Sequence, residues 1–532
     1  MKTIPESIEI KASPEAYEEA YGFVDSLLKR NGITKAVNTE VMLVFEALYH
    51  DITDQTSEDT VLRITGLDSF GDIRIRFGYQ GAPFIRADET AIELTPEQRI
   101  LRAYADRIDC TYHSAYNNIS ISVKRSPKRA VISCVSAIFL AILAYGLIHF
   151  ATDAQTEAYI ANNFVKPFEI LFARAMLMIA GPVTFFSLLK NLTDTYIVSS
   201  SVSSTRKIQV QTLITSFISI VLALLVSLPV AALLQDRITI LNEYEVADFS
   251  GTPFAEMIYS IMPVDILSVF QTISPFPMII VALITTYAFC SSGKYFDSMK
   301  KATDACYTLF SSMLTLIMFS LPVFTFASFA DMLLSKGASV LLYILSFILF
   351  VILSLAVMAL FYAVRLKAGK IEVRPFIGKI KGLILENLEI NSAIDAAPFN
   401  IRYCVRNFRI NRKSLEQRLP VLAQINLDGN CYVLTLITIL IMMLSNTTFS
   451  VVNIAAVAVL VLFLSLGAPN QPGSVLIGLI ILMNYLGIDD LLPVAILCEV
   501  VFGSMLNIIN IIGDIVTVVI MDKKENNHLS SD

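Results

Sequence analysis

Tryptophan is absent from the sequence, and charged residues are scarce. Only 16% of the 532 residues are Asp, Glu, Lys or Arg, whereas a soluble protein of ordinary composition carries about 25%. Hydrophobic residues make up 55% of the chain, and the mean hydropathy is +0.64. The composition excludes an ordinary soluble enzyme and indicates an integral membrane protein. Any aromatic belt at the membrane interface must therefore consist of the 20 Tyr and 33 Phe residues.

Paired cysteines are also lacking, and no apolar leader is expected. We expect neither a disulfide framework nor a zinc site, because the spacing of the seven cysteines is irregular. They are Cys110, Cys134, Cys290, Cys306, Cys404, Cys431 and Cys498. Residues 1–120 are polar and mixed, so we expect no cleavable signal peptide.

Residues 1–124 have the pattern of a soluble α/β domain. The run Ile73-Arg74-Ile75-Arg76-Phe77 alternates apolar and charged residues, which is typical of a half-buried strand. Thr95 and Pro96 are suited to the N-cap and first position of a helix. We expect helices over 14–30, 37–53 and 95–108, and strands over 62–65, 73–77 and 118–124.

Long apolar segments begin directly after a basic linker, residues 125–129. A basic cluster beside a first membrane span lies on the cytoplasmic side, so the N-terminal domain is expected in the cytoplasm. The segments long enough to cross a bilayer are 130–150, 164–189, 208–234, 257–290, 306–332, 338–364, 419–444 and 491–521.

The charges of the connecting loops agree with these spans. The loop 236–256 carries five acidic residues and one Arg, so it is expected outside. The loop after the sixth span is basic and is expected inside; its cations are Arg365, Lys367, Lys370, Arg374, Lys379 and Lys381. The C-terminal tail, residues 523–532, begins with two Lys residues. Both termini are therefore expected in the cytoplasm.

Two further segments, 382–399 and 450–486, are expected to form hairpins that do not cross the bilayer. The first would enter from the cytoplasm and the second from outside, which is the result of an inverted repeat. The predicted fold is mostly α and polytopic. It has eight transmembrane helices, two re-entrant hairpins that enter from opposite sides, and the N-terminal α/β domain.

Polar and helix-breaking residues interrupt the apolar sequence between residues 390 and 514. They form four groups, at 391–398, 426–430, 467–474 and 507–514. An unpaired carboxylate or a free peptide group is unfavourable in a bilayer, so such residues face a cavity or an ion. Gly and Pro interruptions that recur in this way predict a transport site built from broken helices.

The order of these motifs resembles the dicarboxylate/amino-acid:cation symporter family, the glutamate transporter homologues, over residues 130–522. The motifs are Asn426-x-Asp428-Gly429, Pro472-Gly473 at a hairpin tip and Asn510-x-x-Gly513-Asp514. The resemblance implies a sodium-coupled symporter of a small polar solute and not an enzyme. It also implies elevator-type alternating access, a homotrimer among the lipids of the cell membrane, sodium as the coupling ion, no other cofactor and no nucleic-acid partner. Residues 130–374 would be mostly scaffold and residues 375–522 the transport core.

The same resemblance implies the sodium ligands. One site would use Thr215, Ser216, Asn426 and Asp428, and the other would use Asn510 and Asp514, which share one helix face. Two alternatives stay open at this point. Asp514 could be a buried structural carboxylate, and Thr215 and Ser216 could be helix-packing hydroxyls.

The expected solute site departs from the acidic amino-acid carriers. Gly503 and Leu506 stand where those carriers have the Asp and the Arg that bind the amino group and the distal carboxylate, so the bidentate Arg contact is missing. Asp395 would either bind a cationic group or cap a helix. The expected solute contacts are Ser392, Asp395, Gln471, Pro472, Gly473, Gly503, Leu506 and Asn507. We therefore expect a neutral or singly charged solute, not a dicarboxylate or an acidic amino acid.

Residues 1–124 resemble the GHKL ATPase fold in its anti-sigma-factor kinase branch. Glu46 to His50 stand at the Glu-x-x-x-Asn helix, and Tyr79 to Phe84 at the Asp-x-Gly-x-Pro-Phe segment. His50 replaces the magnesium-holding Asn, Tyr79 replaces the adenine-binding Asp, and the glycine-rich lid is missing. We therefore expect a degenerate domain that docks with a cytoplasmic regulator. The alternative for the whole chain is a membrane sensor with a transporter-like receptor and this domain as its output.

Overall fold

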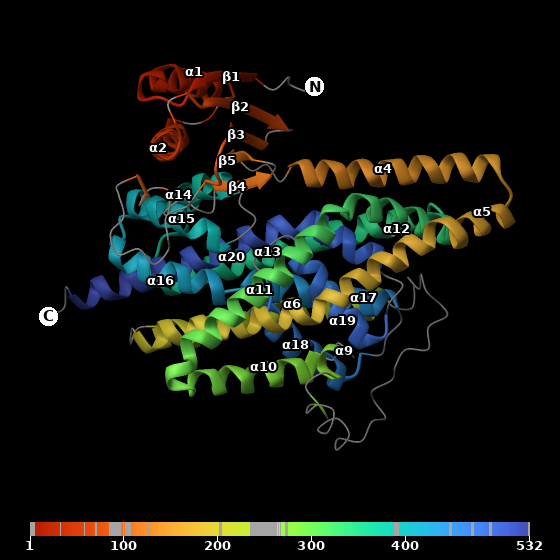
Figure 1. Cartoon of the computed structure of the whole chain (residues 1–532). Coiled ribbons are helices and arrows are strands. Elements are labelled where there is room, and N and C mark those ends of the chain that lie inside the picture. The colour runs from red at the N-terminus through yellow and green to blue at the C-terminus, as the bar shows by residue number, and fades with distance from the viewer. Residues whose placement is uncertain are drawn as a thin grey trace. The chain divides into compact units, whose positions relative to one another are not determined.

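A computed structural model of the chain divides into two compact units, Met1–Ile132 and Ser133–Asp532, whose elements are labelled in Figure 1. The residues that the structure describes are 6–31, 33, 35–57, 59–69, 72–84, 97–98, 101, 108–113, 115–124, 128–201, 205–234, 263, 265, 268–271, 275–387, 393–445, 449–469, 473–488 and 492–529.

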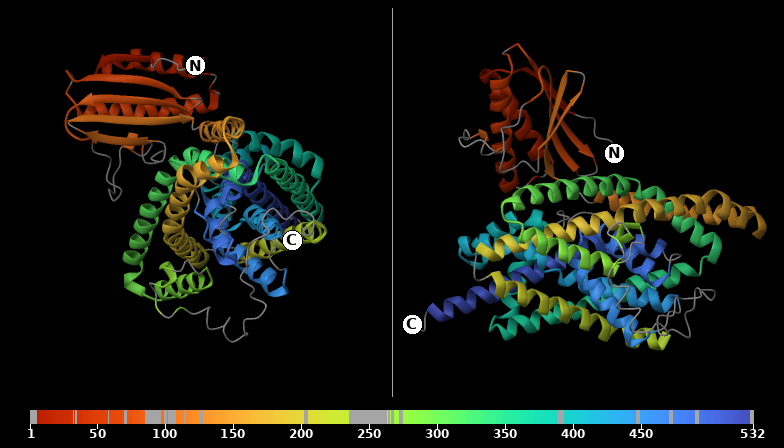
Figure 2. Two further views of the ribbon diagram at one scale, coloured as in Figure 1. Left: turned by 90° about the vertical axis from the view of Figure 1, so that its right-hand side faces the viewer. Right: turned by 60° about the horizontal axis from the view of Figure 1, so that its bottom comes forward.

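The first unit is an antiparallel sheet with helices against one face. Its strands are β1 (Glu6–Lys11), β2 (Val61–Ser69), β3 (Asp72–Gln80), β4 (Ile108–His113) and β5 (Tyr116–Lys124), in the order β1-β2-β3-β5-β4. The helices are α1 (Tyr17–Arg30) and α2 (Lys35–Gln55), after a 3-10 turn at Pro14–Ala16; Figure 2 shows both on the same side of the sheet. Ile73, Ile75 and Phe77 are buried against the helices, while Arg76 between them is exposed. This alternation follows from the two-residue period of a strand.

Most of the predicted N-terminal elements are confirmed. The first two helices and the three strands are present. The third helix, expected over 95–108, lies largely outside the described residues. The predicted end of this helix is wrong, because Ile108 begins strand β4. Strands β1 and β4 were not predicted. Strand β1 pairs with β2, which is distant in the sequence and which a local pattern does not reveal, whereas β4 pairs with β5, which follows it directly.

The second unit is helical. Its elements are α4 (Lys128–Ala151), α5 (Ala154–Ile160), a π-helical turn (Ala161–Val165), α6 (Lys166–Ser201), α7 (Thr205–Leu234), α9 (Ser268–Gln271), α10 (Pro275–Cys290), a 3-10 turn (Gly293–Tyr295), α11 (Phe296–Phe319), α12 (Leu321–Lys336), α13 (Val340–Ala368), α14 (Val373–Asn387), α15 (Ala393–Phe408), α16 (Arg412–Ile425), α17 (Asp428–Leu444), α18 (Val451–Leu466), α19 (Ser474–Leu486) and α20 (Leu492–Leu529).

Seven segments of the described residues are long and apolar enough to cross a membrane. They are Val131–Ala151, Ala154–Ile197, Ile208–Leu233, Gly293–Phe319, Val340–Ala368, Arg412–Leu444 and Met505–Lys524. The fourth predicted span, 257–290, lies partly outside the described residues, and its described helix α10 is shorter than a span. The fifth prediction, 306–332, is wrong in position. The helix there ends at Phe319, and α12 begins with Leu321-Pro322 after Ser320, since a proline is favoured at the start of a helix and disrupts its interior.

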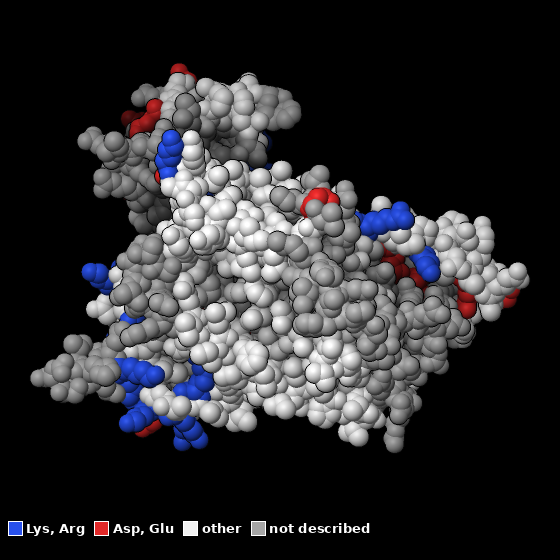
Figure 3. Space-filling model, turned by 90° about the horizontal axis from the view of Figure 1, so that it is seen from below, with Lys and Arg blue, Asp and Glu red and all other residues white. Residues whose placement is uncertain are grey.

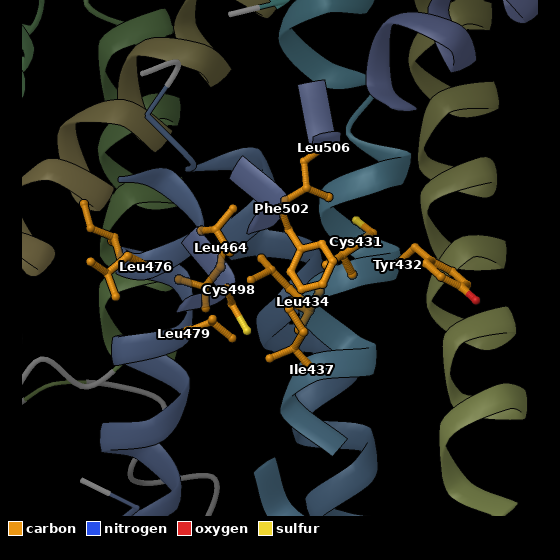
Figure 4. Packing of buried hydrophobic residues seen from close by; sticks show 14 of the residues in the cluster. Cys431, Tyr432, Leu434, Ile437, Leu464, Leu476, Leu479, Cys498, Phe502 and Leu506 are labelled. Atoms are coloured by element: carbon orange, nitrogen blue, oxygen red, sulfur yellow. The ribbon is translucent and has the colours of Figure 1, made fainter. Parts of the chain in front are cut away.

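Helix α17 is the centre of this unit. Every residue from Asp428 to Leu444 is buried, and α7, α13, α18, α19 and α20 pack around the helix. Figure 4 shows Leu434 and Ile437 of α17 in the same apolar cluster as Phe502 of α20. A helix that is apolar on all sides belongs in a core. Polar groups at the beginning of α17 are therefore removed from lipid and from bulk water.

The outer helices expose apolar side chains. Leu147 of α4, Leu316 of α11 and Leu342 of α13 are 73%, 74% and 70% exposed. On the face in Figure 3, a broad part of the described surface is white, which means that it is neither basic nor acidic. Extended apolar surface of this kind needs an apolar environment, which a lipid bilayer supplies.

Candidate functional site

The helical chain is interrupted where α16 meets α17. Asn426 has φ −90° and ψ 81°, and Leu427 has φ −107° and ψ 44°, so neither residue is helical. The interruption lies within the polar group 426–430, where the sequence predicted a broken helix. Gly429 follows it because helix α20 comes very close here. A Cβ at this position would lie 2.9 Å from both Asn510 Oδ1 and Ile509 Cβ, and the Gly429 N–H donates to Asn510 Oδ1 at 2.9 Å.

The structure brings all six predicted sodium ligands into one buried cluster. Asn426 Nδ2 donates to Asp514 Oδ1 at 2.8 Å, and Asn510 Nδ2 donates to Asn430 Oδ1 at 3.2 Å. From α7, Ser216 Oγ lies 3.4 Å from Asp428 Oδ1. The members come from α7, α17, α20 and the α16–α17 interruption. All six are at most 5% exposed: Thr215, Ser216, Asn426, Asp428, Asn510 and Asp514.

The Thr215 hydroxyl has two acceptors within reach: Asn426 Oδ1 at 3.4 Å and the Thr212 carbonyl at 2.9 Å. Because a hydroxyl has one proton, it can donate fully to only one of them. Asp428 Oδ2 is buried and has no hydrogen-bond partner among the described residues. Carboxylate, amide and hydroxyl oxygens are the ligands that hard cations take, so the donor set of the cluster fits sodium.

Arg365 joins the cluster from helix α13, and sequence reasoning missed this. The sequence placed Arg365 with the cations of a cytoplasmic loop. In the structure its Nη1 lies 3.6 Å from Asp428 Oδ2, and its Nη2 donates to Thr517 Oγ1 at 2.8 Å. Tyr362, one turn earlier, donates from its hydroxyl to the Ile509 carbonyl at 3.3 Å. The only signal in the sequence was that Arg365 directly follows an apolar span.

The beginning of α19 is held by Glu499 of α20. The Gly473 N–H donates to Glu499 Oε1 at 2.7 Å, and the Leu476 N–H donates to Glu499 Oε2 at 3.1 Å. Gly473 has φ 98°, a conformation that glycine adopts without strain. Glu499 is 8% exposed. A buried carboxylate at the beginning of α19 satisfies helix N–H groups and complements the helix dipole.

The predicted solute contacts are only partly described. Gly503, Leu506 and Asn507 lie on α20, and Leu506 is 2% exposed. A Cβ at Gly503 would lie 2.9 Å from Glu499 Oε1, so the Glu499 carboxylate fills the space beside this glycine. Asp395 lies in the first turn of α15. Ser392, Gln471 and Pro472 lie outside the described residues.

In the N-terminal unit, Tyr79 and His50, which differ from the GHKL pattern, both pack against neighbouring side chains. Tyr79 is 1% exposed, and its burial raises the pKa of its hydroxyl to about 12. The ring of His50 stacks on that of Tyr17 with 5.4 Å between centroids. Asn117 holds the segment that follows β3: it accepts the Phe84 N–H at 2.9 Å and donates to the Ala82 carbonyl at 2.8 Å. These contacts favour a structural role for both substitutions.

Comparison with known proteins identifies a family for the helical unit. The family model described as the sodium:dicarboxylate symporter family matches residues 129–524, which is more than half of the chain. No curated protein matches the chain. The resemblance inferred from the motifs over 130–522 is therefore confirmed, whereas the GHKL resemblance of residues 1–124 stays a prediction.

Proposed function

The chain belongs to the sodium:dicarboxylate symporter family, and from this premise we propose that it couples sodium to the transport of a small solute that carries at most one charge. It is a multi-pass membrane protein of a transporter family. The observation that carries the proposal is the buried cluster at the α16–α17 interruption, where two carboxylates, amide oxygens and hydroxyls converge. A buried carboxylate costs several kcal/mol unless a cation pairs with it.

The solute class follows from the charges around α20. A dicarboxylate brings a second negative charge into a dry site, where it needs a basic partner. The sequence has no Lys or Arg from 419 to 521, Leu506 replaces the Arg of the acidic amino-acid carriers, and Arg365 lies against Asp428. Glu499 instead places a negative charge beside Gly503. This position suits an amino group or another hydrogen-bond donor, and it repels a second carboxylate.

We also propose how the protein is arranged. The pairs α14–α15 and α18–α19 form the two re-entrant hairpins, and both termini lie in the cytoplasm, as the loop charges indicate. The transport core moves by an elevator mechanism against a scaffold in a homotrimer. Because α7 packs closely on α17 and α13 packs on both α17 and α20, we include α7 and α13 in the moving body with residues 375–522.

The test is uptake into proteoliposomes under an imposed sodium gradient. Labelled neutral and singly charged amino acids, aspartate and succinate should be compared for the parent and for Asp514→Asn. We expect sodium-dependent uptake of a solute from the first group, and a loss of its sodium dependence in Asp514→Asn. The control is Asp304→Asn, which removes a carboxylate that pairs with Lys300 and is 39% exposed. Saturable uptake of aspartate or succinate at micromolar concentrations would overturn the solute class.

A further inference from the structure

Arg365 is not a solvated loop cation. Its side chain is 11% exposed, and its guanidinium lies 5.6 Å from the centre of the Phe361 ring and 6.0 Å from that of Tyr362. Arginine often stacks on aromatic rings in this way. Nη2 donates to Thr517 Oγ1 at 2.8 Å, and Thr517 in turn donates to the Gly513 carbonyl. These contacts fix the guanidinium at the cluster from one side and leave Nη1 toward Asp428.

One atom of Arg365 and one atom of Asp428 face each other, and both lack a hydrogen-bond partner among the described residues. Nη1 of Arg365 and Oδ2 of Asp428 are buried, have no hydrogen-bond partner among the described residues and lie 3.6 Å apart. Arg365 attracts both carboxylates of the cluster, and Asp428 repels Asp514. Two carboxylates and one guanidinium leave the cluster with a single negative charge.

We propose that Arg365 is a tethered cation for Asp428, so that the cluster takes one exchangeable monovalent cation, at Asp514, instead of two. The inference rests on the proposed sodium coupling and adds a residue that sets its stoichiometry. An arginine stays charged at every physiological pH and, unlike a sodium ion, it cannot dissociate. The Asp428 half of the cluster is therefore neutralised in every state in which α13 and α17 keep their contact.

The test measures sodium-dependent stability, not transport. Full-length protein in detergent is melted across a sodium series, with choline chloride keeping the ionic strength constant. A bound ion stabilises the native state in proportion to the logarithm of its concentration above the dissociation constant, so the slope reports the number of ions. We expect a slope of about one ion for the parent and about two for Arg365→Met, by the same relation. Arg365→Lys keeps the charge and should keep the slope of the parent.

A second set of variants leaves Arg365 in place. Asp428→Asn leaves one carboxylate and the guanidinium, so the cluster becomes neutral and the sodium response should disappear. The double variant Arg365→Met with Asp428→Asn returns one negative charge and should regain a slope of about one ion. This set decides the question even if Arg365→Met alone does not fold.

The failures are distinguishable. If the parent responds to sodium and Asp428→Asn responds as strongly, Arg365 does not neutralise Asp428, and the inference is overturned while sodium coupling stands. The same conclusion follows if Arg365→Met has the slope of the parent. If neither the parent nor the double variant responds to sodium, sodium coupling itself fails, and the inference fails with it.

Discussion

The hydrogen bonds between Glu499 and the beginning of α19 lead to a quantitative prediction. Glu499→Gln keeps the size of the side chain and removes its charge. One oxygen can still accept an N–H, from either Gly473 or Leu476, but the amide nitrogen is itself a donor and cannot accept the other. The variant therefore loses one charge-assisted hydrogen bond and leaves a buried N–H without an acceptor near the beginning of α19.

The free energy that the closed hairpin loses in this variant follows from these two changes. A hydrogen bond to a charged group contributes about 1.5–3 kcal/mol, and an unsatisfied buried donor costs about 1–3 kcal/mol. The two terms overlap because they concern the same N–H groups, so the closed hairpin should lose about 2–4 kcal/mol relative to an open one. At about 1.4 kcal/mol for each factor of ten, the open population rises roughly 30- to 700-fold. The apparent affinity for solute falls as the closed fraction falls.

Hydrogen–deuterium exchange followed by mass spectrometry measures this opening directly. Peptides that cover Gly473 and Leu476 should exchange faster in Glu499→Gln, whereas peptides from the middle of α17 should not change. Glu416→Gln is the matched control, because Glu416 is 49% exposed and pairs with Arg412 on the surface of α16. Exchange at the hairpin tip that is the same in Glu499→Gln and in the parent would refute the reasoning.

Three further predictions concern the rest of the chain. Gly429→Ala forces a Cβ to within 2.9 Å of Asn510 Oδ1, so it should lower the stability by about 1–3 kcal/mol, measured as a lower melting temperature. The full chain should not hydrolyse ATP, and magnesium-dependent turnover that is lost in Glu46→Ala would contradict this. Burial raises the pKa of Asp51, so the native state binds this proton more tightly than the unfolded state does, and stability falls as pH rises through that range. Asp51→Asn should therefore raise the melting temperature of the N-terminal unit at neutral pH and have little effect below the ordinary pKa of Asp.

Much of the helical arrangement could be predicted because it depends on local pattern. The α18–α19 pair ends and begins at the expected residues, since Gly467 and Gly473 interrupt long apolar runs. The polar group 426–430 predicted a broken helix, and the α16–α17 interruption lies there. The residues from α7 were also identified by resemblance, although they are more than two hundred positions from Asp428.

The features that the sequence did not predict depend on where a side chain points and on partners that are distant in the sequence. The positive-inside rule counts a basic residue and does not say where its side chain points, so Arg365 was assigned to a loop when it lies against Asp428. Glu499 has no sequence neighbour that reveals its role, because its partners are backbone N–H groups of another helix. The fifth span was placed too late because apolar sequence continues through Ser320, and hydropathy alone does not detect the break there.

The cluster residues come from distant parts of the chain, and this limits which segments can be exchanged with a relative in a chimera. Thr215 and Ser216 come from α7 and Arg365 from α13, while their partners on α17 and α20 lie far downstream. A chimera that exchanges only the residues after 375 with a relative would combine one parent's carboxylates with the other parent's hydroxyls and guanidinium. If the relative has no arginine at the position of Arg365, the hybrid cluster differs in charge from that of at least one parent. Domain exchange in this chain should therefore transfer α7 and α13 together with the C-terminal helices.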